Sequence, residues 1–466
     1  MHVKREGERG LVLKRLRFSG GALAVAALVA AMVATAAYGI TSAVIGGQLG
    51  EVSCLNPTGT GTTPSGKPCT AGPSVDDPTG IALMDDGSRI FVTGPSNNAV
   101  SIFERDRASG RITVLHDTPC ISEGGVQVGG LACGTGRGLN GPVELVSTQN
   151  NIYVITDGDD SVVTLTRESP GAKWKQRDPS RNCIWAGAST SNCNQGFGIT
   201  SPASVVFSGN FVYVGAQNSI AVFKRDSSGA LVQLDAPNGC IANDTQGGHC
   251  TAVTGLFSGR VVEMDVARGG ATLYAVDGTS LLQFTRDTTS GMLSFNKCYN
   301  DAGANGCVDV NAMTNPTSLD VNSSGKSVYV AAHGSNAIDV FARNISSGNL
   351  AQVALPGGCV SQGGAGGCTS APHLTGVSKV MVQKTNRFVY AIAGDGTANF
   401  KRDAVKFTLT PLAGVGGCTT ETGDGGACKL APGLAGASDW VGTGTNHIYV
   451  TGETHNTVAV LKLNAS

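Results

Sequence analysis

Apolar and polar residues alternate over short runs along most of the chain. In the stretch SVYVAAHGSNAIDVFARNISSGNLAQVAL, residues 327–355, such runs are separated by Asn, Gly and Ser residues. Alternation with a period of two predicts strands, and the polar residues and glycines between the runs predict turns. No stretch after Val44 has a convincing helical pattern. We therefore expect an all-β fold after the first 45 residues.

This pattern belongs to a repeated unit. Residues 327–359 align with residues 211–240 and 89–120, and weaker copies begin at Asn151, Thr272, Arg387 and His447. Each copy adds a preceding run such as TSLDVN to three further runs, which predicts four antiparallel strands per unit. Repeated four-stranded units around one axis are the blades of a β-propeller.

Counting the units predicts seven blades. Their first strands are expected to begin near Thr79, Val143, Ala203, Val262, Thr317, Ser378 and Ser438. The last unit supplies only three strands before the sequence stops. The segment GQLGEVSC (47–54) has the pattern of the missing fourth strand. We expect it to pair with the last three strands and close the ring, which removes an exposed sheet edge.

The 14 cysteines follow the same repeat. Zinc would require four ligands where each loop offers two, and free catalytic thiols would not be expected in matched couples. We expect one disulfide per blade, each stabilising the fold by about 2–3 kcal/mol through closure of a short loop. The glycines in these loops allow the backbone angles that a small covalent ring needs. The couples are Cys54 and Cys69, Cys120 and Cys133, Cys183 and Cys193, Cys240 and Cys250, Cys298 and Cys307, Cys359 and Cys368, and Cys418 and Cys428.

The N-terminus has the pattern of a targeting segment. Six basic residues before residue 18 are followed by an uncharged stretch from Gly21 to Ala37 that continues to about Ile45. We interpret residues 1–45 as a cleaved signal peptide or an uncleaved membrane anchor, and residues 46–466 as the propeller. Both alternatives place the propeller outside the cytoplasm, secreted or anchored, where cysteines pair.

Composition excludes one class of partner. Charged residues make up 14% of the chain and the formal net charge is −1, so the clustered basic surface of a nucleic-acid-binding protein is absent from the sequence. The 66 glycines and 41% hydrophobic residues agree with many short strands joined by turns. We expect a monomer that contacts a membrane only through residues 1–45.

Several repeats resemble a known family. The segments IYVTGETHNTVAVL (448–461), IFVTGPSNNAVSIF (90–103) and VYVAAHGSNAIDVF (328–341) resemble the YVTN-type repeat. This repeat is found in the seven-bladed lactonase-like propellers, which include 6-phosphogluconolactonases and cyclases acting on carboxymuconate. The form with cysteine loops is similar to exported bacterial members. The resemblance implies the fold and suggests lactone hydrolysis, but it supplies no catalytic motif, and fold alone does not establish function.

Charged residues recur at one position of the first strands. Aligned on Ser318, the seven residues are Gly80, Glu144, Ser204, Glu263, Ser318, Lys379 and Asp439. First strands line the central channel of a propeller, so Glu144, Glu263, Lys379 and Asp439 are the candidate catalytic residues. A carboxylate could activate water and Lys379 could stabilise an oxyanion. The alternative is a water-filled channel with solvated charges.

Turns between second and third strands carry a second set of candidates. These are expected on the rim that also bears the cysteine loops, and they could bind a ligand or act as bases. The alternative is that they only form turns. We expect no metal ion and no cofactor. The candidate binding residues are His333, Glu453, His455, Asp157 and Asp395.

A recurring Arg-Asp pair follows the third strand. It occurs as Arg105-Asp106, Arg225-Asp226, Arg286-Asp287 and Arg402-Asp403. We interpret this pair as residues that form a turn on the rim opposite the cysteine loops.

Three functions remain open at this point. The first is hydrolysis of a lactone or similar small cyclic ester at the channel mouth. The second is a non-catalytic surface module that binds a polysaccharide or a protein partner, and the third is a purely structural envelope protein. Turnover of lactones, and its loss when the four channel residues are substituted, would separate them.

Overall fold

The structure is a computed structural model that describes residues 49–60, 62, 66, 68–72, 75–190, 192–443 and 446–463. The predicted targeting segment, residues 1–45, lies outside the described residues. Within the described part of the chain, no helix is long and apolar enough to cross a membrane.

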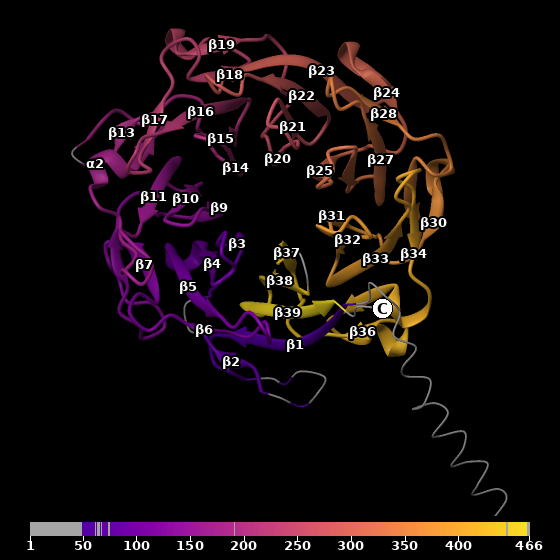
Figure 1. Cartoon of the computed structure of the whole chain (residues 1–466), viewed down its shortest axis with the longest axis horizontal. Coiled ribbons are helices and arrows are strands. Elements are labelled where there is room, and N and C mark those ends of the chain that lie inside the picture. The colour runs from indigo at the N-terminus through magenta and orange to yellow at the C-terminus, as the bar shows by residue number, and fades with distance from the viewer. Residues whose placement is uncertain are drawn as a thin grey trace, which may run out of the picture. The chain divides into compact units, whose positions relative to one another are not determined.

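Seven sheets formed by the described residues surround a central channel, as the repeat count predicts (Figure 1). The inner three strands of each blade are consecutive antiparallel neighbours. The first strands are β3 (Ile81–Leu83), β9 (Pro142–Ser147), β14 (Ser204–Ser208), β20 (Glu263–Val266), β25 (Pro316–Val321), β31 (Val377–Val382) and β37 (Ala437–Gly442). The second strands are β4 (Arg89–Gly94), β10 (Asn151–Thr156), β15 (Phe211–Ala216), β21 (Thr272–Val276), β26 (Ser327–Ala332), β32 (Phe388–Ala393) and β38 (His447–Gly452). The third strands are β5 (Ala99–Arg105), β11 (Ser161–Thr166), β16 (Ser219–Arg225), β22 (Leu281–Arg286), β27 (Ala337–Arg343), β33 (Gly396–Arg402) and β39 (Thr457–Leu463).

The fourth strand of each blade is antiparallel to the third, and a short fifth strand, which the sequence analysis did not anticipate, pairs parallel to the fourth. The fourth strands are β7 (Cys120–Glu123), β12 (Cys183–Trp185), β18 (Cys240–Ala242), β23 (Leu293–Asp301), β29 (Cys359–Gln362), β35 (Cys418–Thr420) and β1 (Leu49–Asn56). The fifth strands are β8 (Gly134–Gly136), β13 (Asn194–Gln195), β19 (Cys250–Ala252), β24 (Val308–Val310), β30 (Thr369–Ala371), β36 (Lys429–Leu430) and β2 (Thr70–Ala71). Four blades carry one more short strand on the third, namely β6 (Ile112–Val114), β17 (Leu231–Gln233), β28 (Leu350–Gln352) and β34 (Leu409–Pro411).

The ring closes as predicted. Strand β1 pairs antiparallel with β39, from Leu49 opposite Leu463 to Leu55 opposite Val458. Blade seven therefore consists of β37, β38, β39 and β1, with β2 outside it. We number the blades from the one that begins with β3.

Helical structure among the described residues is limited to single turns. They are α2 (Pro179–Asn182) and the 3-10 segments η1 (Pro95–Asn97), η2 (Gln246–Gly248), η3 (Ala304–Gly306), η4 (Ala365–Gly367), η5 (Gly414–Gly416) and η6 (Gly423–Gly426). They lie in the loops, so the all-β expectation is confirmed.

All seven predicted disulfides form, and each joins the fourth strand to the start of the fifth. The paired Cα atoms lie 4.5–4.9 Å apart. In the Cys359–Cys368 loop, Gly363, Gly364 and Gly366 have φ of 70°, 79° and 71°. These left-handed angles disfavour residues with a β-carbon, which explains the glycine content of the loop.

Contacts between blades form the core. One aromatic residue at the centre of each second strand is buried against the next blade. These residues are Phe91, Tyr153, Tyr213, Tyr274, Tyr329, Tyr390 and Tyr449.

The Arg-Asp pairs form turns, as predicted. The Asp106 carboxylate accepts hydrogen bonds from the amides of Ala108 and Ser109 at 3.0 and 2.7 Å. These bonds hold the pKa of Asp106 below its usual value. The preceding Arg105 is buried and reaches Tyr449 of the neighbouring blade, a contact between blades that the sequence did not reveal.

Candidate functional site in the central channel

The seven aligned positions are structurally equivalent. Each lies opposite the residue two places after the central aromatic of the second strand, for example Glu263 opposite Val276 and Lys379 opposite Ile392. Strand alternation turns this position toward the channel. Side chains of different first strands therefore meet there although they are far apart in sequence.

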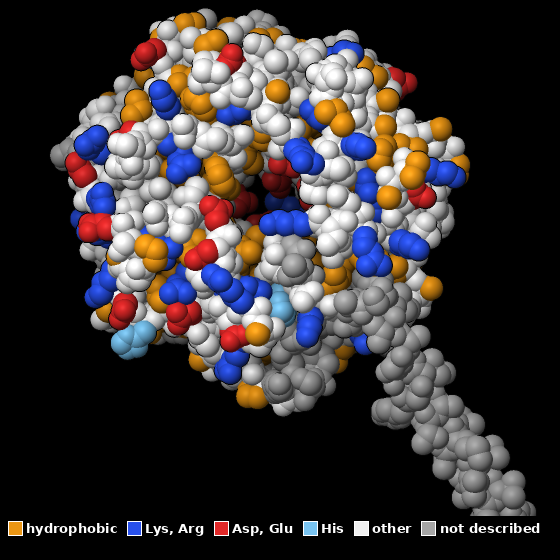
Figure 2. Space-filling view, viewed as in Figure 1, with side chains coloured by type: hydrophobic (Ala, Val, Ile, Leu, Met, Phe, Trp, Pro, Cys, Tyr) orange, Lys and Arg blue, Asp and Glu red, His pale blue; other side chains and the backbone are white. Residues whose placement is uncertain are grey.

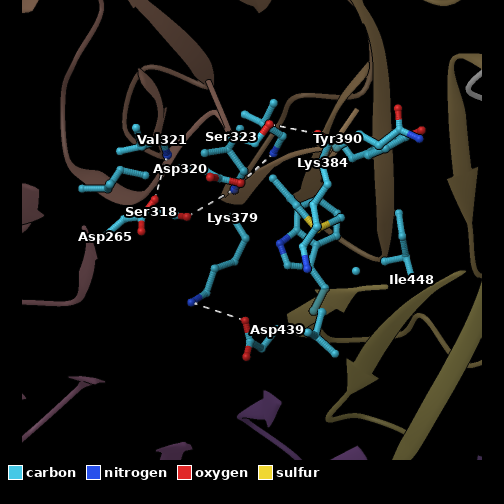
Figure 3. A pocket seen from close by; sticks show the side chains of 18 of the residues that line it. Asp265, Ser318, Asp320, Val321, Ser323, Lys379, Lys384, Tyr390, Asp439 and Ile448 are labelled. Atoms are coloured by element: carbon cyan, nitrogen blue, oxygen red, sulfur yellow. Dashed lines mark hydrogen bonds and ion pairs between the residues drawn. The ribbon is translucent and has the colours of Figure 1, made fainter. Parts of the chain in front are cut away.

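Lys379 lies at the centre of the charged group. Its Nζ is 2.6 Å from Oε2 of Glu263. It is also 3.6 Å from Oδ1 of Asp439, the contact drawn in Figure 3. The side chains of Lys379, Glu263 and Asp439 are only 19%, 20% and 11% exposed. The other Asp439 oxygen accepts a hydrogen bond from the Ile81 amide, which fixes the carboxylate between blades seven and one. Burial lowers the pKa of Lys379, but Glu263, Asp439 and Glu144 together raise it, so the ammonium is charged.

Glu144 joins this group electrostatically. Burial raises the pKa of Glu144 well above its usual value, and the Asp439 charge raises it further, while Lys379 opposes the shift. Its Oε1 accepts a hydrogen bond from the Leu145 amide at 2.8 Å. Glu144 thus keeps its proton to higher pH than an ordinary glutamic acid. Burial also raises the pKa of Glu263, although the Lys379 ammonium beside it opposes that shift. The structure brings all four candidate catalytic residues into one electrostatic group.

Two further carboxyl groups lie on first strands, just beyond the aligned positions. Asp265 and Asp320 are two residues beyond Glu263 and Ser318 on β20 and β25. The Asp265 carboxylate accepts a hydrogen bond from the Val321 amide at 2.9 Å, and the Asp320 carboxylate accepts one from the Val382 amide at 2.7 Å. Val321 and Val382 each lie on the first strand of the next blade. Burial raises the pKa of Asp265 to about 7, and burial with the Asp265 charge raises that of Asp320 well above its usual value. The sequence analysis missed this pair because it aligned one position per blade, and the same alignment two residues on would have found it.

A cavity of about 470 Å³ is lined by three of the four candidates, Glu263, Lys379 and Asp439, but not by Glu144, and it extends beyond them. It is lined by the channel residues Glu263, Asp265 and Lys379, and by Ser323 and Lys384 of the turns that follow first strands. Figure 2 shows acidic and basic side chains inside the central opening of the disc. The cavity thus reaches the rim opposite the disulfide loops, not the rim on which the turn candidates were expected to complete the site.

The five turn candidates do not line this cavity. Their contacts are with neighbouring loops instead. Asp395 accepts the Gly436 amide at 3.0 Å, and Asp157 accepts the Ser201 hydroxyl at 2.8 Å and lies 3.4 Å from Arg260. The remaining three are His333, whose Nδ1 is 3.2 Å from the Val377 carbonyl; His455, 3.5 Å from Glu421; and Glu453, whose pKa is raised by burial.

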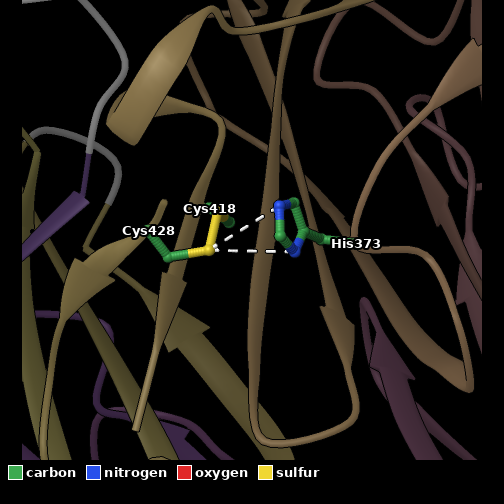
Figure 4. Close-up of side chains that lie close together, drawn as sticks. All are labelled: His373, Cys418 and Cys428. Carbon is green, nitrogen blue, oxygen red and sulfur yellow. Dashed lines mark hydrogen bonds between the residues drawn. A yellow bond between two sulfur atoms is a disulfide. The ribbon is translucent and has the colours of Figure 1, made fainter. Parts of the chain in front are cut away.

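A histidine and two cysteines also lie close together. His373 is 3.7 Å from Sγ of Cys428, which is bonded to Cys418 (Figure 4). Both sulfur atoms are used in the disulfide and cannot act as thiolate ligands. We therefore interpret this cluster as a histidine packed on a disulfide.

Comparison with known proteins identifies the fold. No protein-family model and no curated protein matches the chain. A Bacteroides fragilis protein proposed to be a 6-phosphogluconolactonase is similar in structure, with 13% identity, a TM-score of 0.50, and 79% of this chain and 94% of that chain covered. Hydrazine synthase of Kuenenia stuttgartiensis has 14% identity and a TM-score of 0.50 over 84% and 97% of the two chains. The periplasmic gluconolactonase of Pseudomonas aeruginosa has 14% identity and a TM-score of 0.47 over 73% and 84%.

The chain is therefore a seven-bladed β-propeller whose structural neighbours include 6-phosphogluconolactonase-like propellers. At these identities the likeness concerns the fold alone. The seven disulfides add that the protein is suited to an oxidising environment.

Proposed function

We propose that the protein hydrolyses a lactone or similar small cyclic ester in its central channel. The observation that carries this proposal is the meeting of Lys379, Glu263, Asp439 and Glu144 in one partly enclosed group. It combines a fixed positive charge with carboxyl groups in different environments, which is the arrangement that acid–base chemistry on an ester requires. The fold of the Bacteroides fragilis protein supports the same class of reaction by analogy.

The roles follow from the charges. A carboxylate, Asp439 or Glu263, takes a proton from water as the water oxygen attacks the carbonyl carbon. The oxyanion forms near the Lys379 ammonium, which has donors left after its bond to Glu263. The ring C–O bond then breaks, and Glu144, whose pKa burial raises well above its usual value, supplies a proton to the leaving alkoxide.

The proposed setting is extracytoplasmic. Residues 1–45 would direct export or anchor the protein, and the disulfides would form after translocation. The propeller would act as a monomer on a small lactone or carbohydrate derivative. The alternative is a non-catalytic module for a polysaccharide or protein partner, which would bind without turnover.

Hydrolysis of a broad panel of γ- and δ-lactones tests the proposal. Asp439→Asn and Lys379→Met should each lower kcat/KM by about 100-fold or more, since each removes a charge required in the transition state. Ser204→Ala, at an uncharged position of the same ring, should leave kcat/KM nearly unchanged. Absence of turnover on the whole panel, or equal rates in all variants, would refute the hydrolase.

A further inference from the structure

One contact between blades recurs at four of the seven interfaces. At four interfaces, the arginine that ends a third strand donates its Nε hydrogen to the tyrosine hydroxyl of the preceding blade at 2.5–2.8 Å. The guanidinium carbon lies 5.4–5.9 Å from the centre of the same tyrosine ring. The pairs are Tyr449 with Arg105, Tyr213 with Arg286, Tyr274 with Arg343, and Tyr329 with Arg402.

Each of these arginines is also held by its own blade. A second guanidinium nitrogen donates to a backbone carbonyl in the turn after the first strand, at Gly87, Gly270, Gly325 or Asn386. The space between neighbouring blades is thus built to hold a planar cation against a tyrosine. Bonds in a fixed plane and stacking on an aromatic face are the properties that distinguish Arg from Lys.

At the interface of blades two and three, Arg225 lies over the Tyr153 ring at 5.6 Å, but its Nε has no hydrogen-bond partner among the described residues. The arginine is thus present there, and only the bond to the tyrosine is missing.

The interface of blades six and seven lacks the arginine itself. The central aromatic of blade six is Tyr390, but the aligned residue at the end of β39 is Leu463. Tyr390 is fully buried, and its hydroxyl has no hydrogen-bond partner among the described residues. At the interface of blades one and two, the aligned residue is Phe91, which has no hydroxyl group to satisfy. It packs edge-on against Trp174. Among the aligned tyrosines, Tyr390 is therefore the one whose buried hydroxyl has no hydrogen-bond partner in the described part of the chain.

The place of the missing arginine lies beside the channel cavity. Tyr390 and Ile448 line that cavity (Figure 3), and so do Leu463 and Trp440. The same cavity is lined by four carboxyl groups but only two amines, Lys379 and Lys384. The four are Glu263, Asp265, Asp320 and Asp439. An excess of carboxylates near an aromatic wall favours an organic cation.

We propose that this cavity binds a guanidinium group carried by a small molecule, which donates to the Tyr390 hydroxyl between blades six and seven. The apolar part of the ligand would lie against Trp440 and Ile448. This inference rests on the recurring arginine–tyrosine contact and not on the proposed hydrolase activity. One of the two proposals can therefore be wrong while the other is right.

Binding should release protons. Burial raises the pKa of Asp265 to about 7 and that of Asp320 well above its usual value, and a nearby cation favours their ionised forms. Glu263 on β20 is the other charged group that acts on both, and Lys379, Asp439 and the titratable His447 line the same cavity. Lys384 at the cavity rim adds a repulsive charge. Affinity for the cation should therefore rise as the pH increases through about 7.

Calorimetric titration with butylguanidine and its neutral analogue butylurea tests the proposal on the purified chain. Butylguanidine should bind at least about tenfold more tightly, because only it supplies the cation. The heat of binding should also depend on the buffer, which reports the released protons. Equal affinity of the two compounds, or no binding of butylguanidine, would overturn the proposal.

The chain offers a matched pair of variants. Leu463→Arg supplies the missing guanidinium from the protein itself, so it should raise Tm and abolish butylguanidine binding. Tyr449→Phe removes a hydroxyl at a filled interface and should lower Tm without changing binding. If Leu463→Arg folds and still binds butylguanidine as wild type does, the ligand does not occupy this place.

Discussion

At the residue scale, the environment of a carboxyl group decides its chemistry. Asp106 and Asp265 both accept hydrogen bonds from backbone amides, yet their pKa values shift in opposite directions. Asp106 is exposed in a turn, where hydrogen bonds favour the charged form. Asp265 is enclosed by the first strands, where loss of hydration outweighs those bonds. The residue type alone therefore does not indicate which carboxyl group carries a proton at neutral pH.

Asp265 should make the stability of the protein depend on pH. An aspartic acid with a raised native pKa stabilises most below its unfolded pKa of about 4, and this contribution is lost as pH rises through its native pKa of about 7. Asp265→Asn keeps an oxygen for the Val321 amide but cannot ionise. Relative to wild type, the variant should gain on the order of 3 kcal/mol between pH 4 and pH 8 in urea unfolding.

Asp309 on β24 provides a control for this measurement. Its side chain is exposed, so Asp309→Asn should give the same difference from wild type at both pH values. A pH-independent difference for Asp265→Asn would show that the native protein ionises Asp265 as easily as the unfolded chain does.

At the element scale, each blade extends by a strand that the four-stranded pattern did not predict. The fifth strand runs parallel to the fourth, and parallel neighbours normally need a crossover of a dozen or more residues. Here a short glycine-rich loop makes the return, and a disulfide joins its two ends. The covalent bond replaces the packing that a crossover helix would provide. This explains why the cysteine couples have the same periodicity as the blades.

Removing one such disulfide should weaken the protein measurably. Cys359→Ser with Cys368→Ser opens a loop of about ten residues, and should lower the free energy of unfolding by about 2–3 kcal/mol. Urea unfolding of the double variant and of wild type under oxidising conditions measures the loss. In a reducing buffer the difference between the two proteins should shrink, since wild type then loses the same bond. A loss below about 0.5 kcal/mol would mean that strand pairing alone holds the loop.

At the scale of the whole molecule, one strand joins the two ends of the ring. Strand β1 comes first among the described strands and completes the blade that β37, β38 and β39 begin. Without it, β39 would present a free hydrogen-bonding edge of seven residues. The closing strand also carries Cys54, whose disulfide to Cys69 fastens β2 outside it.

Deletion of β1 should therefore change the state of assembly. A variant that lacks residues 1–56 should form oligomers or aggregates through β39, whereas one that lacks only residues 1–45 should not. Light scattering after size-exclusion chromatography distinguishes these outcomes. A folded monomer without β1 would show that the ring does not depend on this closure.

The sequence by itself determined the fold, because its signals are local. Period-two alternation marks each strand, the cysteine couples count the blades, and GQLGEVSC supplies the strand that the last unit lacks. Alignment of the repeats also identified Glu144, Glu263, Lys379 and Asp439, because equivalent positions of the seven blades lie at the same height in the channel.

Only the tertiary structure decided what those residues and their neighbours do. The ion pair of Lys379 with Glu263 and the raised pKa of Asp265 arise from strands that converge across the channel. The same holds for Tyr390, because the absence of an arginine at Leu463 has meaning only once each tyrosine is seen to contact the following blade. Hydration and distance are properties of the assembled ring, and no local pattern in the chain encodes them.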